Sequence, residues 1–268
     1  MAKLEAILNG ESINFGSSVV EVQDYIGRNQ VDIYYASLFQ TERVIFLGER
    51  HTTISDKQEL VDNLSLMRNA GLTHLAFEMF SASMQGAIDR YYQSGDNRNE
   101  IFSYLQDHWG DKGEGVAEKY MEIVDTAKNL GIKIIAIDID SDEYQSKNPS
   151  ETWVKRNRQW AKLIAEKLED GEAKVLVYHG SGHAGYYPVD DRANNELRKL
   201  GHDSLTVKYC GGEMFEKGYV YGFDDKVAKS AVELDLQKNR FAVNVNRSTS
   251  RGGDLYIHLP QVEQPKLI

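Results

Sequence analysis

Two short segments of the chain each combine an apolar run with a glycine and, three positions after that glycine, a histidine. The first ends at His51 and reads VIFLGERH, and the second ends at His183 and reads VLVYHGSGH. Imidazole transfers protons near neutral pH and binds transition metals. A single Gly-x-x-His pattern is as typical of a loop histidine as of a site, but two copies favour a function. His51 and His183 are therefore the leading candidates for a functional site.

Two glutamates accompany these histidines. Glu49 lies between the first glycine and His51, and Glu78 ends the apolar run Leu75-Ala76-Phe77. A carboxylate at the end of a buried strand must be paired, hydrogen-bonded or bound to a metal, because burying it alone is too costly. A structural ion pair, with Arg50 for example, is the alternative to a functional role for Glu78.

Three further residues are expected to support the candidate histidines and glutamates without binding the ligand themselves. Asp138 follows the apolar run 133–137 and could either orient a histidine or cap the next element. His179 points to the opposite side of its strand from Tyr178, which is also typical of a buried core histidine. We expect Asp138, His179 and Arg50 to hold the candidate ligands in place.

The segments that carry these residues alternate between strands and helices. Strands are expected at 43–47, 73–77, 133–137, 174–178 and 204–209, with helices near 55–71, 81–92, 98–107, 116–130, 149–171 and 188–200. This alternation predicts an α/β fold with a mostly parallel central sheet flanked by helices. Ligands of such folds lie beyond the carboxyl ends of the strands. We therefore expect the candidate residues to meet at that edge, with Gly48 turning the chain towards it.

The two ends of the chain are expected to add antiparallel strands. Asn9-Gly10 between apolar segments predicts a small hairpin over residues 3–15. Near the C-terminus, strands are expected at 219–223, 241–245 and 254–259. Residues 1–268 are expected to form a single domain, with a core at about 40–210 and a β-rich extension at about 211–260.

Composition excludes several classes of protein. The net charge of −10 disfavours nucleic-acid binding, and the basic residues 155–162 are expected to form a solvated helical face. The single cysteine, Cys210, excludes an intrachain disulfide and is expected to be a small buried residue. No apolar run reaches the roughly 20 residues of a membrane span, and no signal peptide or lipobox is visible. We therefore expect a cytoplasmic protein, with non-classical secretion left open.

Several of these motifs together resemble a known family. The segment from Val44 to His51, the sequence FEMF at 77–80, Gln85, the sequence DRY at 89–91 and Trp109-Gly110 are similar to the ChaN family. These are haem-binding uptake proteins within the Tiki, TraB, erythromycin-esterase and ChaN superfamily. The similarity extends over about residues 40–205.

The resemblance has two implications for function. Tiki-like members are metal-dependent proteases defined by two Gly-x-x-His motifs and a glutamate, which correspond here to His51, His183 and Glu78. Erythromycin esterases hydrolyse a lactone with a related Glu and His set. ChaN itself is a lipoprotein that binds haem through tyrosine, for which the nearby candidates are Tyr144, Tyr186 and Tyr187. Unlike ChaN, the chain is expected to carry no export signal, and it has Asp138 where an asparagine is expected.

Our first hypothesis is a metal-dependent hydrolase, either a peptidase or an esterase. His51, Glu78 and His183 would hold a divalent transition metal (Zn, Mn or Co) that activates water, with Glu49 as general base or further ligand. In a metal-free version, Glu49 orients His51, which activates water directly. The second hypothesis is a haem-binding protein without turnover, using Tyr186 or Tyr187 in a surface or homodimer pocket. The third is a regulatory protein with a degenerate site.

Overall fold

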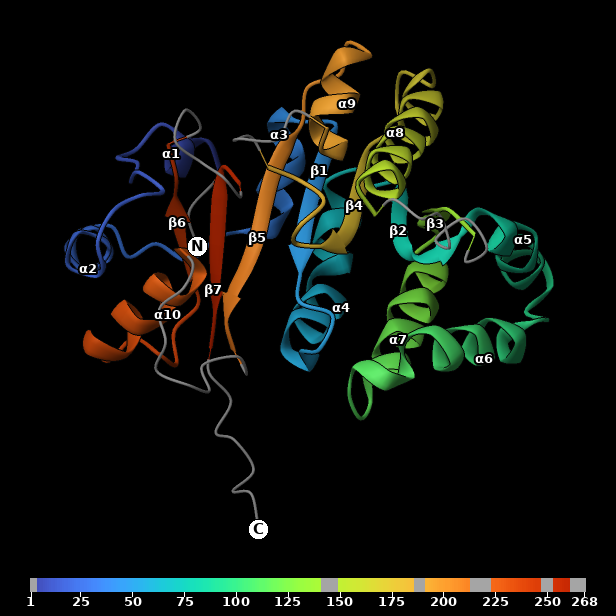
Figure 1. Cartoon of the computed structure of the whole chain (residues 1–268), viewed down its shortest axis with the longest axis horizontal. Helices are drawn as coiled ribbons and strands as arrows, with labels where there is room; N and C mark the ends of the chain where they lie inside the picture. Colours follow the sequence, from blue (N-terminus) through green and yellow to red (C-terminus); the bar gives the residue numbers. More distant parts are fainter. Residues whose placement is uncertain (1–3, 141–148, 186–190, 213–222, 247–252, 261–268) are drawn as a thin grey trace.

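One seven-stranded sheet forms the centre of the molecule (Figure 1). The computed structural model describes residues 4–140, 149–185, 191–212, 223–246 and 253–260. The strands are β1 (Val44–Glu49), β2 (His74–Ser81), β3 (Lys133–Asp138), β4 (Val175–Gly180), β5 (Leu205–Gly211), β6 (Phe241–Asn244) and β7 (Leu255–Leu259). Their order is β3-β2-β4-β1-β5-β7-β6. All neighbours are parallel except β6, which is antiparallel to β7, so the predicted fold class is confirmed.

Helices cover both faces of this sheet. They are α1 (Leu4–Leu8), α2 (Val19–Arg28), α3 (Leu38–Thr41), α4 (Ile54–Asn69), α5 (Gln85–Ser94), α6 (Arg98–Trp109), α7 (Val116–Asn129), α8 (Pro149–Leu168), α9 (Ala193–Lys199) and α10 (Phe223–Glu233), with short 3-10 turns at Tyr35–Ser37, Ala82–Met84 and Gly110–Lys112. No helix within the described ranges is long and apolar enough to cross a membrane.

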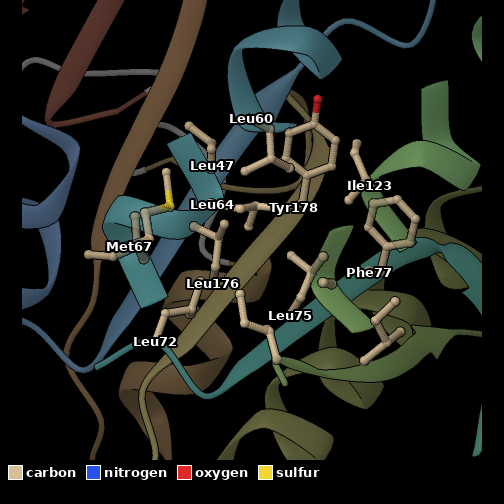
Figure 2. Close-up of a cluster of buried hydrophobic side chains, with 14 of the residues drawn as sticks. Leu47, Leu60, Leu64, Met67, Leu72, Leu75, Phe77, Ile123, Leu176 and Tyr178 are labelled. Carbon is tan, nitrogen blue, oxygen red and sulfur yellow. The ribbon is translucent and has the colours of Figure 1, made fainter. Parts of the chain in front are cut away.

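Alternation along the strands divides the core between the two faces. In β1, Ile45 and Leu47 pack in the cluster formed with α4 and α7, whereas Val44 and Phe46 pack in the cluster formed with α8 and α9. Figure 2 shows the first cluster, in which Leu60, Leu64 and Met67 of α4 lie against the sheet. Since both faces are covered, the parallel strands are apolar at nearly every position rather than at every second one.

The N-terminal hairpin predicted from Asn9-Gly10 is wrong, because residues 4–8 form the helix α1. The amide of Asn9 donates to the carbonyl of Glu5 at 3.0 Å, and the amide of Gly10 donates to that of Ile7 at 3.1 Å. The Asn-Gly pair therefore ends a helix instead of reversing a strand.

The C-terminal part of the chain joins the same sheet. β7 pairs in parallel with β5, and β6 adds to β7 as the antiparallel edge strand. The strand predicted at 219–223 is wrong at Phe223, which begins α10, and its other residues lie outside the described ranges. The helix predicted from Pro188 is described only from Ala193 onwards, as α9.

The strand order brings the candidate residues together. β4 lies between β2 and β1, with Glu49 in register with Gly180, and Phe77 in register with Tyr178. Glu49, the last residue of β1, and Glu78, in the second half of β2, therefore flank the end of β4. Each of them is buried.

Candidate active site at the carboxyl ends of β1, β2 and β4

Glu49 is a fully buried carboxylate that holds His51 by its ring. Its Oε1 accepts from Nδ1 of His51 at 2.6 Å and from the Tyr120 hydroxyl at 2.9 Å. Its Oε2 lies 2.6 Å from the ammonium of Lys57, whose side chain is also fully buried. Lys57 donates as well to backbone carbonyls around the β1–α4 turn, including that of Thr53 at 2.9 Å. One lysine thus neutralises Glu49 and ties the turn that carries His51.

These contacts shift the pKa values of both partners. Burial raises the pKa of Glu49, but the His51 hydrogen bond and the Lys57 charge outweigh burial and lower it overall. Burial lowers the pKa of His51, but the hydrogen bond to Glu49 and the charge of Glu78 raise it overall. With Nδ1–H directed at Glu49, Nε2 of His51 is the nitrogen left to gain or lose a proton.

Glu78 is the second buried carboxylate, and its counterion is Arg156 of α8. The guanidinium lies 2.7 Å from Oε1 of Glu78 and also binds Asp138 through two contacts of 2.7 and 2.9 Å. The other Glu78 oxygen accepts from the Gly180 amide at 2.5 Å. Arg156 therefore joins the ends of β2 and β3, and Glu78 joins β2 to β4.

His183 faces Glu78 from the loop after β4. Its Nε2 lies 3.3 Å from Oε1 of Glu78, and its Nδ1 lies 2.9 Å from Oδ1 of Asn157. Asn157 has a defined orientation, because its amide nitrogen donates to the Asp191 carbonyl at 2.9 Å. The asparagine oxygen therefore accepts, and Nδ1 of His183 carries a proton.

The protonation of this pair follows from burial. Burial and the Arg156 charge lower the pKa of His183 well below its usual value. Burial raises the pKa of Glu78, against the charges of His51 and Arg156. A neutral His183 with its proton on Nδ1 would present a lone pair to the carboxylate. A proton on Glu78 or on Nε2 of His183 would remove that repulsion.

The two histidines approach the same backbone segment. A Cβ at Gly180 would overlap the ring of His51, so the imidazole lies directly over this glycine. The ring of His51 packs on Trp109 with centroids 4.7 Å apart. The ring of His183 lies between Trp153 and Trp160, at 4.0 and 4.4 Å. Gly180 thus separates the imidazole of His51 from the carboxylate of Glu78, and indoles support both histidines.

Gly48 has a different role from the expected turn. It lies inside β1, and a Cβ there would meet Cα of Ser181 at 3.0 Å and Cγ of Lys208 at 3.3 Å. The prediction that Gly48 turns the chain is wrong. The absence of a side chain instead lets Lys208 pass and donate to the Ser181 carbonyl, which ties down the loop leading to His183.

The residues expected to support the site, Arg50, His179 and Asp138, have different partners and roles in the structure. Arg50 does not pair with Glu78: it binds Asp56 and the Gly211 carbonyl, at 2.5 and 2.7 Å, and so connects β1 to the end of β5. His179 is fully buried, and burial lowers its pKa to about 3, so it is a neutral core histidine. Asp138 holds Arg156, and Asn157 is the residue that orients a histidine. The tyrosine candidates at positions 144, 186 and 187 lie outside the described residues.

Sequence reasoning missed Lys57, Tyr120, Arg156 and Asn157. Lys57 falls in the same helical stripe as Leu60 and Leu64, and a lysine in an apolar stripe is a usable signal of a buried ion pair. The basic residues around Arg156 predict a solvated face, which is wrong for Arg156 because its side chain is only 12% exposed. Its one-turn spacing from Trp153 and Trp160, both on the expected buried face, was the available signal.

The geometry does not fit the metal site expected for His51, Glu78 and His183. The described residues contain no group of three or more His, Cys, Asp or Glu side chains arranged to hold a metal ion. Glu78 accepts from Arg156 and from the Gly180 amide. A guanidinium beside the carboxylate would also repel a divalent cation.

Replacing Arg156 by Met is expected to destabilise the fold by roughly 3–5 kcal/mol, because two buried carboxylates lose their shared cation. The matched control is Arg158→Met on the same helix, whose side chain is 66% exposed and whose ion pair with Glu196 spans 3.5 Å. It should cost about 1 kcal/mol or less. Urea unfolding measures both. Equal losses would show that Arg156 does not neutralise the site.

Replacing Glu49 by Gln is expected to lower the pKa of His51, because burial then acts without the compensating charge. The pair stabilises the fold fully between about pH 4.5 and 6.5, the ordinary values of the two groups. Its contribution is lost as pH falls through the lowered pKa of Glu49, or rises through the raised pKa of His51. NMR titration of His51 measures the shift, with exposed Glu114→Gln as control. An unchanged pKa would disprove the pairing.

Comparison with known proteins supports the family resemblance. Residues 36–147 match a family model described as haem-binding uptake, Tiki superfamily, ChaN. The type III effector protein HopBA1 of Pseudomonas syringae pv. aptata is 26% identical over 147 residues. That match covers 52% of this chain and 61% of the relative, so it spans less than two thirds of the relative's length.

Solved structures show the same fold. A structure of HopBA1 has a TM-score of 0.55 at 17% identity, covering 84% of this chain and 90% of that one. A Pasteurella multocida toxin structure, described as having a thiol-protease like catalytic triad in its C-terminal region, has a TM-score of 0.51 at 18% identity and covers 65% of this chain and 24% of that one. The resemblance of this chain to the ChaN family of the Tiki superfamily, which its motifs indicated, is thus confirmed through the match at residues 36–147.

Proposed function

We propose that this chain is a hydrolase of esters or amides in which His51 activates water without a bound metal. The observation that carries the proposal is the 2.6 Å contact between Glu49 Oε1 and His51 Nδ1. A carboxylate that holds one imidazole nitrogen orients the ring and stabilises its protonated form, and the other nitrogen becomes the base. The raised pKa of His51 suits a base that works near neutral pH.

In the first step, Nε2 of His51 takes a proton from a water molecule as the water oxygen attacks the substrate carbonyl. The imidazolium that forms is stabilised by Glu49, which Lys57 and Tyr120 hold in place. Trp109 packs on the other side of the imidazole and restricts its rotation. His51 thus needs no movement between its neutral and protonated forms.

In the second step, the leaving oxygen or nitrogen needs a proton. A proton shared by Glu78 and His183, on the other side of Gly180 from the His51 ring, is the proposed source. Arg156 provides positive charge at the same place and stabilises negative charge on the carbonyl oxygen of the substrate. The pKa of His51 is raised and that of His183 is lowered. Titratable groups whose pKa values move apart in this way are typical of an acid and a base in one site.

A thiol nucleophile does not fit this chain. Cys210 is the single cysteine of the sequence, and it is fully buried in the cluster formed by α2, α10 and the last strands. Burial also raises its thiol pKa well above the usual value. The thiol-protease like chemistry described for the Pasteurella toxin therefore does not extend to this protein.

His51→Ala is expected to lower hydrolysis of p-nitrophenyl acetate or of a fluorogenic peptide roughly 100- to 10,000-fold, because the general base is removed. His202→Ala, at a half-buried loop histidine outside the site, is the control and should retain wild-type rates. Dialysis against EDTA should leave the wild-type rate unchanged. Loss of activity in EDTA that added Zn, Mn or Co restores would contradict the metal-free mechanism.

Haem binding is the second candidate, because the matched family is described as haem-binding. Titration of the purified chain with haemin should give a Soret band that saturates at a fixed ratio if this function is present. The double variant Tyr186→Phe and Tyr187→Phe tests the proposed ligands and should shift the Soret maximum. A haem complex formed equally well by this variant would remove both tyrosines from the proposal. Light scattering on the same sample measures whether the chain forms the homodimer.

A further inference from the structure

A cleft lies along the outer edge of β3, away from the candidate active site. Its volume is about 510 Å³, within the range of pockets that bind small organic ligands. β3 is the last strand of the sheet, and Figure 1 shows α5 beyond its outer edge and α8 on one of its faces. The cleft is lined by residues from β3, α5 and α8, including Ile88, Ile134, Ile135 and Leu163.

The backbone of this edge strand is already paired by side chains. The Gln85 amide donates to the carbonyl of Ile134 at 3.1 Å and accepts from the amide of Ala136 at 2.8 Å. The Tyr92 hydroxyl donates to the carbonyl of Ile132 at 2.9 Å. A peptide adding as another strand would need these same groups. The floor of the cleft therefore offers hydrocarbon contact rather than a strand-pairing surface.

Positive charge gathers at one end of the cleft. Lys133 begins β3, Lys167 lies in the last turn of α8, and His74 begins β2, so all three lie at the amino-terminal edge of the sheet. Burial and the charges of Lys133 and Lys167 lower the pKa of His74. Among the described residues, Asp170 also acts on His74 and raises its pKa, and Asp89 lines the cleft on the α5 side. The two ammonium groups of Lys133 and Lys167 at this end of the cleft favour an anion.

The cleft continues from this basic end along β3 towards Ala82 and Gln85, which follow β2. Residues 133–136 span about 10 Å of extended chain. We propose that this cleft binds an elongated amphipathic anion, a medium-chain carboxylate, with its acid group between Lys133 and Lys167 and its hydrocarbon chain along the apolar floor. The carboxylate end would then lie on the opposite edge of the sheet from Glu78 and His183.

The test uses decanoate as the probe and isothermal titration calorimetry at low ionic strength. Decanoate should bind saturably with one site per chain, and decanol should bind at least tenfold more weakly. Lys133→Gln and Lys167→Gln should each weaken decanoate binding about three- to fivefold, and the double variant more than tenfold, with smaller effects at high salt. Lys162→Gln, whose side chain on the same helix is 77% exposed and outside the cleft, is the matched control.

Three results would overturn the proposal: no saturable binding of decanoate, equal affinity for decanol, or equal affinity in the double variant and the Lys162→Gln control. Thermal melting checks that each variant is folded, which exposed lysine substitutions should allow. None of these lysines belongs to the candidate active site. Hydrolysis rates should therefore stay at wild-type levels in the double variant, so failure of the cleft and failure of the proposed hydrolase are separate outcomes.

Discussion

Burial of two carboxylates at the end of one parallel sheet is the constraint on which the candidate site depends. Glu49 and Glu78 are each almost fully removed from solvent, and an isolated charge in that environment is too costly to retain. Each is therefore matched by a cation from a helix that covers a different face of the sheet: Lys57 from α4 and Arg156 from α8. The site is consequently held between the two helical layers and not by loops alone.

This arrangement explains why the two halves of the site differ in protonation. Glu49 has a complete set of donors, so it stays ionised and makes His51 more basic. Glu78 shares its cation with Asp138, and burial raises its pKa, while the neighbouring His183 becomes less basic. A base and a proton donor can thus lie on either side of one glycine. The same polar contacts serve both the fold and the proposed chemistry.

The aromatic residues around the site have a mechanical role. Trp109 packs on His51, whereas Trp153 and Trp160 enclose the ring of His183. Rings held in this way keep their orientation when the protonation state changes, and orientation is what a carbonyl-attacking water requires. At the outer edge of β3, side chains have another role: Gln85 and Tyr92 form hydrogen bonds with the strand's backbone. Beside them lies an apolar cleft with a basic end.

The sequence by itself determined the fold class and the edge at which chemistry could occur. Apolar runs ending in Glu49, Glu78 and His183 place those residues at strand ends, because parallel strands in alternation with helices all end at the same edge. Local signals were ambiguous where one pattern serves two structures: Asn9-Gly10 ends a helix here, and Gly48 permits close packing instead of a turn.

Only the tertiary structure decided which groups neutralise the carboxylates. Lys57 is eight residues from Glu49 in the sequence, and Arg156 is 78 residues from Glu78. The residues next to each glutamate do not indicate which cation will pair with it. Arg156 reaches Glu78 because β3, which precedes α8, lies beside β2 in the sheet. The tautomer of His183 likewise follows from Asn157 and the Asp191 carbonyl, which meet it only in the folded chain. Residue types therefore identified the candidate chemistry, and long-range packing decided its protonation and its counterions.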